Sequence, residues 1–162
     1  MANVSLRANA KQSLQERKRN ALVISASAGV GKTELAKRYS NVLDLDCSLY
    51  SKSPNWPHNY IKAINENRKK YEYILIFTKL QDFFDLDYEF FFPEKAAVPE
   101  YEKRLAARGG RWKEWSKTVY AEYDTHLKTA QALGKKIVFL RPGETLESFL
   151  LQNQDKYPKL VP

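Results

Sequence analysis

The sequence predicts an α/β domain with three layers, in which a mainly parallel sheet of five strands is flanked by helices and one helical segment forms a lid. Short apolar segments rich in strand-forming residues alternate with longer segments of helical periodicity. The apolar segment 73–77 is nearly continuous, as in a central parallel strand covered on both faces. Alternating strands and helices require right-handed crossovers, which place a parallel sheet between two helical layers.

The size and composition of the chain fit one globular domain, with 162 residues of which 43% are hydrophobic. A basic arm is predicted at 1–19 and a single domain at 20–162, with the lid at about 97–118. The sequence has no apolar run of about 18 residues and begins without the apolar stretch of a signal peptide. We therefore expect a cytoplasmic protein without membrane association.

Charge and the content of cysteine and histidine limit the kinds of ligand. The net charge of +8, from 27 Lys and Arg against 19 Asp and Glu, suits an anionic ligand, either a short nucleotide or a polynucleotide. Cys47 is the only cysteine, so an intramolecular disulfide is excluded, and His58 and His126 are too far apart for a zinc motif. A metal is expected to be Mg²⁺ held mostly by oxygen atoms.

In the first half of the domain, strands are predicted at 21–24 and 41–47, with a helix between them that begins near Lys32. The apolar stripe of this helix comprises Leu35, Ala36, Tyr39 and Val42. Pro57 follows a segment of turn-forming residues and would open the next helix. The inward-facing residues of that helix are predicted to be Tyr60, Ile61 and Ile64. The third strand is the apolar segment 73–77.

In the second half, a brief helix at 81–84 precedes a fourth strand at 88–92. The lid begins with a helix from about Val98 that stops at Gly109 and Gly110. A long helix follows, with helical spacing of apolar residues from Trp112 to Leu133.

The chain ends with a fifth strand at 136–140 and a turn at 141–143. Thr145 can cap the final short helix, because a threonine hydroxyl can accept a hydrogen bond from a free amide of the first helical turn.

Residues 26–33 read Ala-Ser-Ala-Gly-Val-Gly-Lys-Thr, the pattern of a phosphate-binding P-loop between a strand and a helix. Gly29 and Gly31 give the backbone the freedom to point consecutive amides at an anion. Lys32 would reach the β- and γ-phosphates, and the Thr33 hydroxyl would bind Mg²⁺. The residues predicted to bind the triphosphate are Ala26, Ala28, Gly29, Val30, Gly31, Lys32 and Thr33.

Two carboxylates follow at the end of the second strand. Alternation along a strand points Asp44 and Asp46 to the same side, and ligands of parallel sheets gather at the carboxyl ends of the strands. One carboxylate would lie near Mg²⁺ and the other would orient or deprotonate an acceptor hydroxyl. The alternative is structural, with Asp46 capping a turn or helix and Asp44 in a solvated ion pair.

The helix of the lid carries Arg104 and Arg108 one turn apart. On a flap that closes over the triphosphate, their guanidinium groups would neutralise charge on the transferred phosphoryl group. The alternative is an exposed charged helix face beside Glu100 and Glu102. Trp112 and Trp115 are expected to pack the following helix rather than stack on a base.

On these residues, the chain resembles the small P-loop nucleoside and nucleotide kinases, in particular the compact adenylate-kinase-like and deoxynucleoside monophosphate kinase-like proteins of bacteriophages. The resemblance covers about 20–152 and is carried by the segments 26–33, 42–46, 101–109 and 137–143. It implies ATP as the phosphoryl donor and Mg²⁺ as the cofactor. The strand 73–77 lacks a terminal acidic residue, and 78–81 lack the substrate motif of adenylate kinases, so the acceptor is not identified.

The resemblance also implies roles for individual residues. Mg²⁺ would be bound by Thr33 and Asp44, and the acceptor by Asp46. Arg104 and Arg108 correspond to lid arginines of nucleoside monophosphate kinases. The turn after the last strand, which comprises Arg141, Pro142 and Gly143, would lie along the adenine ring.

These inferences predict a phosphotransferase that moves the γ-phosphoryl group of ATP to a nucleotide or a similar small anion. Lys32, Asp46, Arg104 and Arg108 would carry the catalysis. The first alternative is a kinase acting on polynucleotide ends or on modified bases of DNA, for which nucleic acid would be the partner. The second is a non-catalytic nucleotide-binding module that interferes with a host factor. The sequence does not specify the oligomeric state.

Overall fold

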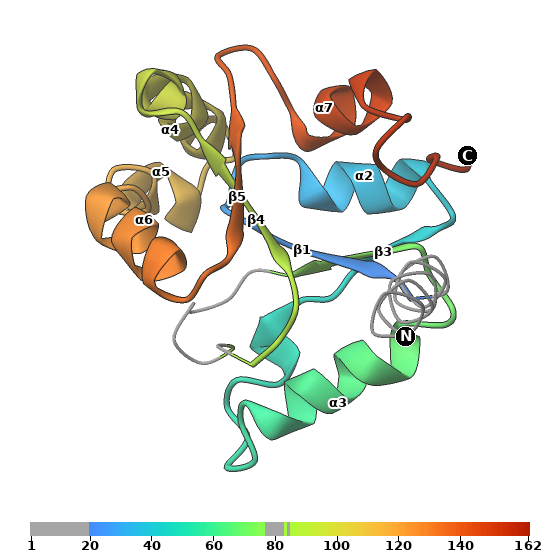
Figure 1. The fold of residues 1–162 in the computed structure, drawn as a ribbon. Helices are drawn as coiled ribbons and strands as arrows, with labels where there is room; N and C mark the ends of the chain where they lie inside the picture. The colour runs from blue at the N-terminus through green and yellow to red at the C-terminus, as the bar shows by residue number, and fades with distance from the viewer. Residues whose placement is uncertain (1–19, 77–82, 84) are drawn as a thin grey trace, which may run out of the picture.

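In the computed structural model, which describes residues 20–76, 83 and 85–162, a five-stranded sheet forms the centre of the domain (Figure 1). The strands are β1 Leu22–Ala26, β2 Val42–Asp44, β3 Tyr73–Ile76, β4 Glu89–Pro93 and β5 Lys136–Leu140. All neighbouring strands are parallel, in the order β2-β3-β1-β4-β5. The predicted α/β class with five parallel strands is confirmed.

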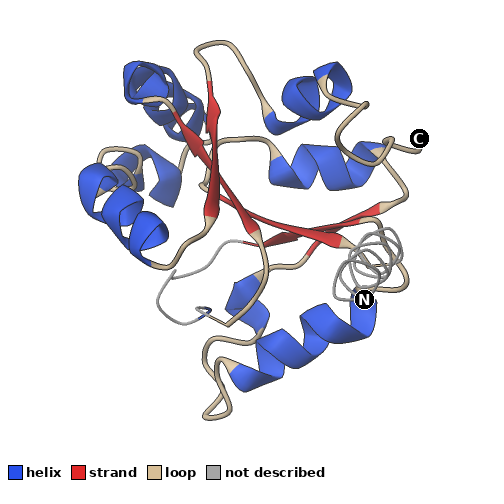
Figure 2. Cartoon of the chain, in the orientation of Figure 1, coloured by secondary structure: helices blue, strands red, loops and turns tan. Residues whose placement is uncertain are grey.

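Helices connect the strands and cover both faces of the sheet. Those described are α2 Lys32–Arg38, α3 His58–Asn67, α4 Val98–Ala107, α5 Arg111–Trp115, α6 Tyr123–Ala132 and α7 Leu146–Gln152, with 3-10 turns η1 Cys47–Leu49 and η3 Lys95–Ala97. Helices α2 and α7 lie on one side of the sheet and α3 on the other (Figure 2). Helix α6 packs against β5 on the face opposite α7, which completes the third layer.

The core is centred on β1 and β3, as the continuous apolar sequence predicts. All four residues of β3 are buried, and Leu22 of β1 pairs with Tyr73 of β3. On its other edge β1 pairs with β4, where Ala26 lies opposite Phe91. A strand paired on both edges and covered on both faces is a rigid support for the loop that follows it.

The order of the strands opens a crevice at the carboxyl end of β1. From β1 the chain passes to α2 on one face, whereas from the adjacent β4 it passes through α4 and α5 to α6 on the opposite face. Neighbouring strands whose connections leave toward opposite faces form the switch point where ligands of open α/β sheets bind. The residues after β1 and β2 therefore lie where a ligand is expected.

The predicted long helix from Trp112 to Leu133 is wrong, because the chain forms two helices, α5 and α6, with turns at 116–122 between them. The Ser116 hydroxyl donates to the Lys113 carbonyl (3.0 Å), and the Thr118 hydroxyl donates to the Trp115 carbonyl (3.0 Å). Hydroxyl side chains that bond to nearby carbonyls compete with regular helix geometry.

Smaller differences concern the ends of other elements. Val42, predicted on the apolar stripe of the first helix, begins β2 because α2 ends at Arg38. The arm at 1–19 and the helix at 81–84 fall wholly or largely outside the described residues. Within the part of the chain that the structure describes, no helix has both the length and the apolar character to cross a membrane.

Helix α4 belongs to the core rather than to a separate lid. Tyr101 and Leu105 are fully buried, and α4 packs directly on Gly29 in the loop after β1. By contrast, α5 has no buried residue. Of the predicted lid at 97–118, α5 is the more exposed part, although Trp112 packs against the core and Ser116 is buried.

The close packing at Gly29 predicts a large cost for a side chain there. Gly29 has φ +92°, and a Cβ would lie 3.3 Å from the Leu105 Cγ. Gly29→Ala should lower the free energy of unfolding in urea by about 2 kcal/mol or more. The control is Gly134→Ala, at φ +67° with no atom within 4 Å of the added Cβ. Gly134→Ala should lower the free energy of unfolding by about 1 kcal/mol. Equal losses in the two variants would contradict close packing of α4 on Gly29.

Candidate phosphate-binding site

The loop at 26–33, called the glycine loop below, joins β1 to α2 in the order that its sequence predicts. Its backbone turns through positive φ at Gly29 (92°) and Gly31 (95°), and α2 begins at Lys32. The backbone amides of residues 28–31 donate no hydrogen bond to an acceptor in the described chain. Amides without acceptors beside a helix N-terminus can bind an anion.

Two contacts from distant parts of the sequence fix the carbonyl side of the glycine loop. The Tyr120 hydroxyl lies 2.9 Å from the Ala28 carbonyl and 2.9 Å from the Ser27 hydroxyl. The Leu146 amide donates to the Val30 carbonyl at 3.0 Å. Because these contacts occupy carbonyls, they leave the amides of the loop to face a ligand. Sequence reasoning missed Tyr120, whose role depends on the break between α5 and α6.

The Lys32 ammonium folds back over the glycine loop. It donates to the Ala26 carbonyl at 2.6 Å and to the Ser27 carbonyl at 3.2 Å. Burial lowers the pKa of Lys32 to about 8, Asp44 opposes this shift, and the charge of Arg108 adds to it. At neutral pH the site therefore holds a mostly charged but poorly solvated ammonium, which an anionic ligand would stabilise.

This lowered pKa predicts how stability depends on pH. Between pH 8 and 10 the unfolded chain binds more protons at Lys32 than the folded chain, so the free energy of unfolding should rise with pH. From pH 8 to pH 10 we expect the free energy of unfolding to rise by about 2 kcal/mol more than in Lys32→Met, as measured by urea unfolding at each pH. Above pH 10 the buried tyrosines lower the free energy of unfolding as the pH rises, since burial raises the pKa of Tyr88 and Tyr120 to about 12. Parallel curves for the two proteins would exclude a depressed Lys32 pKa.

Thr33 and Asp44, the two predicted Mg²⁺ ligands, lie together. The Thr33 hydroxyl donates to the Asp44 carboxylate at 3.0 Å, which links the first residues of α2 to the end of β2. Mg²⁺ usually takes one or two protein oxygens and completes its shell with water and phosphate oxygens. This hydroxyl and carboxylate fit such a site, next to the Lys32 ammonium.

Asp46 lies beyond the strand, contrary to the prediction that strand alternation orients it. β2 ends at Asp44, and the Asp46 carboxylate caps η1 by accepting from the Ser48 amide at 2.9 Å. The alternative in which Asp46 caps a turn or helix is therefore correct for the carboxylate oxygen that accepts this hydrogen bond. Asp46 is nevertheless exposed and lines the same pocket as Asp44.

A pocket of about 280 Å³ brings these groups together beside the glycine loop. Its volume is at the lower end of the range for small-molecule sites. Its lining residues are Ala28, Gly29, Lys32, Thr33, Asp44, Leu45, Asp46, Cys47, Arg108, Trp112, Trp115 and Val119. The lining thus combines residues of the predicted phosphate and metal site with residues of α5 and its neighbouring segments.

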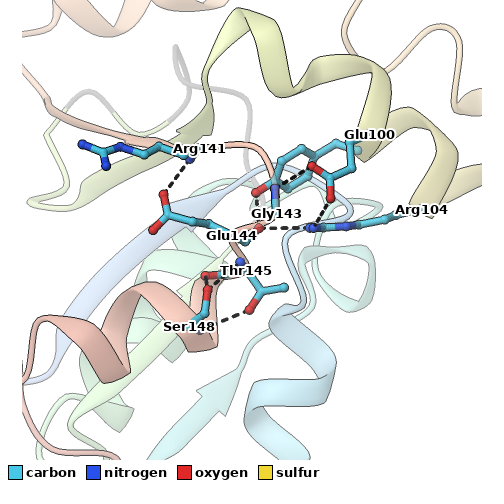
Figure 3. Close-up of polar contacts among 8 residues, drawn as sticks. Glu100, Arg104, Arg141, Gly143, Glu144, Thr145 and Ser148 are labelled. Carbon is cyan, nitrogen blue, oxygen red and sulfur yellow. Dashed lines mark hydrogen bonds and ion pairs between the residues drawn. The ribbon is translucent and has the colours of Figure 1, made fainter.

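The two predicted lid arginines have different surroundings. Arg108 is exposed, lines the pocket, and lies over the Trp112 ring with 5.2 Å between guanidinium carbon and ring centroid. Arg104 does not line the pocket, because its guanidinium pairs with Glu100 at 2.9 Å and donates to the Glu144 carbonyl at 3.1 Å (Figure 3). Arg108 is therefore placed to meet a ligand in the pocket, whereas Arg104 is held by contacts within the protein.

The two tryptophans that were predicted to pack differ in their surroundings. Trp112 is partly buried and packs against the core, as predicted, whereas Trp115 is 48% exposed, and both line the pocket. Their rings meet edge to face with centroids 5.8 Å apart. They give an aromatic wall to the pocket that the two carboxylates also line.

The predicted base-binding turn at 141–143 does not line the described pocket, although the Leu146 amide just after it donates to the Val30 carbonyl of the glycine loop. Arg141, Pro142 and Gly143 are exposed, and α7 follows them with Thr145 as its cap. The predicted cap is confirmed, since the Thr145 hydroxyl accepts from the Ser148 amide at 3.1 Å. The chain matches no protein-family model, and no curated protein matches it. Its function is therefore inferred from the chemistry of these residues.

Proposed function

We propose that the protein is a P-loop phosphotransferase that moves the γ-phosphoryl group of ATP to a nucleotide or a similar small anion. The observation that carries the proposal is that Lys32, the Thr33–Asp44 pair and Arg108 line one pocket beside the amides at 28–31, which have no acceptor within the described residues. Phosphoryl transfer requires mainly positioning and electrostatic stabilisation, and this set of groups provides both.

Each group has a distinct role in the proposed reaction. The amides of the glycine loop and Lys32 hold the phosphates, and Thr33 with Asp44 would hold Mg²⁺, which neutralises charge on the β- and γ-phosphates when bound. The free oxygen of Asp46 orients the acceptor and takes its proton as the acceptor oxygen bonds to the γ-phosphorus. The bond from that phosphorus to the β–γ bridging oxygen breaks, and ADP leaves. Arg108 stabilises the charge on the transferred group.

The aromatic wall favours a second candidate, a kinase acting on a base of DNA or on a polynucleotide end. Trp115 is exposed beside Trp112, and a base lifted from a strand could stack on such a surface. The net charge of +8 is compatible with a polyanionic partner. In that case affinity for the acceptor should fall steeply with salt, because binding would release counterions from the nucleic acid.

A transfer assay with Mg·ATP tests the proposal directly. The acceptor panel comprises nucleoside monophosphates, nucleosides, oligonucleotides with 5′-hydroxyl ends and DNA with hydroxymethylated bases. We expect transfer to at least one nucleoside monophosphate, absent in Lys32→Met. Transfer only to the nucleic acids would favour the second candidate. ATP binding without transfer to any acceptor would overturn both and favour a non-catalytic nucleotide-binding module.

A further inference from the structure

The peptide group between Ala28 and Gly29 is held by a side chain from a distant part of the sequence. The Tyr120 hydroxyl donates to the Ala28 carbonyl at 2.9 Å. In a planar trans peptide the carbonyl and the following amide point in opposite directions, so this bond also fixes the direction of the Gly29 amide. That amide has no acceptor within the described residues. It is therefore turned away from Tyr120 and remains able to donate to an anion.

A second hydroxyl completes this contact. Because the Tyr120 hydrogen goes to the Ala28 carbonyl, the Ser27 hydroxyl, 2.9 Å from the Tyr120 oxygen, must be the donor to that oxygen. Ser27 and Tyr120 are both buried, and burial raises the pKa of Tyr120 to about 12, so its hydroxyl keeps its hydrogen at neutral pH. Buried hydrogen bonds in a chain strengthen one another, and a member left unpaired is costly. This chain therefore holds the loop in one orientation.

Without the contact, the peptide between Ala28 and Gly29 could turn over. Gly29 has φ +92°, and glycine adopts positive and negative φ about equally readily. Rotation of this peptide would point a carbonyl, instead of an amide, at a bound phosphate. Lys32 supports the two preceding carbonyls, but in the proposed function its ammonium moves to the phosphates. The Tyr120 contact does not involve Lys32 and would persist with the ligand bound.

Tyr120 belongs to the turns between α5 and α6, directly after a residue of the pocket. Val119 lines the pocket, and its amide donates to the Trp115 carbonyl at 3.0 Å. The Ala121 amide donates to the Thr118 carbonyl at 3.1 Å. Opening of these turns would break both bonds and withdraw the Tyr120 hydroxyl from the glycine loop.

From these contacts, and resting on the proposed function, we propose that Tyr120 is a positioning residue that holds the Gly29 amide toward the triphosphate and couples phosphate binding to the order of the turns at 116–122. Such coupling is reciprocal: if the Tyr120 contact strengthens phosphate binding by some factor, phosphate binding strengthens the contact by the same factor. A triphosphate in the glycine loop therefore stabilises the part of the pocket beside Val119. The bound donor thus helps to order the pocket in which the acceptor reacts.

Calorimetric titration of the full chain with Mg·ATP and with inorganic tripolyphosphate tests the positioning. Tyr120→Phe keeps the ring but removes the hydroxyl, and it should weaken both ligands by about tenfold, because only a fraction of the loops then has the binding orientation. Tyr123→Phe is the matched control. Tyr123 packs on Phe92 as Tyr120 does, and its hydroxyl donates to the Pro93 carbonyl at 2.7 Å, outside the glycine loop. A merely structural role would affect both variants alike, whereas we expect Tyr123→Phe to keep both affinities within about twofold.

Hydrogen exchange measures the coupling. With saturating tripolyphosphate, the Val119 and Ala121 amides should exchange about tenfold more slowly relative to the amides of α3, and Tyr120→Phe should lose this protection. If Tyr120→Phe does not fold, Ser27→Ala tests the same chain, because it removes the hydroxyl that donates to Tyr120. It should weaken tripolyphosphate by about threefold, and an unchanged affinity would overturn the inference.

The outcomes separate this inference from the proposed function. If Tyr120→Phe binds tripolyphosphate as tightly as Tyr123→Phe does, or if the ligand does not slow exchange at 116–122 in the unaltered protein, the inference is overturned and the proposed function stands. If the unaltered protein binds neither tripolyphosphate nor Mg·ATP, the glycine loop is not a phosphate site, and both are overturned. Weaker binding in Tyr120→Phe, together with no transfer to any acceptor, would overturn only the proposed function.

Discussion

Replacing Lys32 with methionine is expected to reduce phosphoryl transfer by about 10³-fold, the upper range for loss of one preorganised electrostatic group. Methionine keeps most of the apolar length of the side chain but removes the ammonium that lies over the Ala26 and Ser27 carbonyls. The charge would stabilise the transferring phosphoryl group more than the bound triphosphate. The rate constant for transfer should therefore fall further than the affinity for Mg·ATP, as measured by single-turnover kinetics.

Lys37→Met is the matched control, because Lys37 is in the same helix but is exposed, and its ion pair within the described residues is with the exposed Glu34 at 3.8 Å. Its transfer rate should stay within about twofold of that of the unaltered protein, because an exposed ion pair contributes little. Equal losses in the two variants would show that Lys32 acts through helix stability rather than through the phosphates.

Arg108→Ala should reduce transfer by about 10²-fold to 10³-fold while leaving the affinity for Mg·ATP nearly unchanged. Arg108 lines the pocket and its charge is felt at Lys32, so it can act on a phosphoryl group as that group moves toward the acceptor. Steady-state kinetics at saturating ATP measures the effect.

Arg111→Ala provides the control for Arg108. Arg111 also lies over a tryptophan, with 5.8 Å to the Trp115 ring centroid, but it does not line the pocket. Loss of a cation–π contact alone should therefore affect both variants similarly, whereas a role in transfer should affect only Arg108→Ala. Similar rates in the two variants would remove Arg108 from the catalytic groups.

The parts of the fold and site that the sequence predicts are those set by local patterns. The apolar sequence of β3 indicates a central strand, and the order strand, glycine loop, helix follows from the spacing of Gly29, Gly31 and Lys32. Asp44 and Thr33 meet because the carboxyl ends of parallel strands lie at one edge of a sheet. These predictions need no knowledge of side chains distant in sequence.

The remaining features depend on contacts between distant segments. Periodicity continues past Trp115, but hydroxyl groups at Ser116 and Thr118 bond to the backbone, and the chain turns so that Tyr120 reaches the glycine loop. Likewise, helical spacing predicts the same position in the lid for Arg104 and Arg108. Arg104 is held away from the pocket by Glu100 in the same helix and by the Glu144 carbonyl, which is distant in the sequence.

The most direct test of the phosphate site is a crystal structure of the protein with Mg²⁺ and a non-hydrolysable ATP analogue. We expect phosphate oxygens within hydrogen-bond distance of the amides at 28–31, the Lys32 ammonium on the β- and γ-phosphates, and the Thr33 hydroxyl on the metal. A nucleotide bound elsewhere, with the Lys32 ammonium still on the Ala26 and Ser27 carbonyls, would contradict the account.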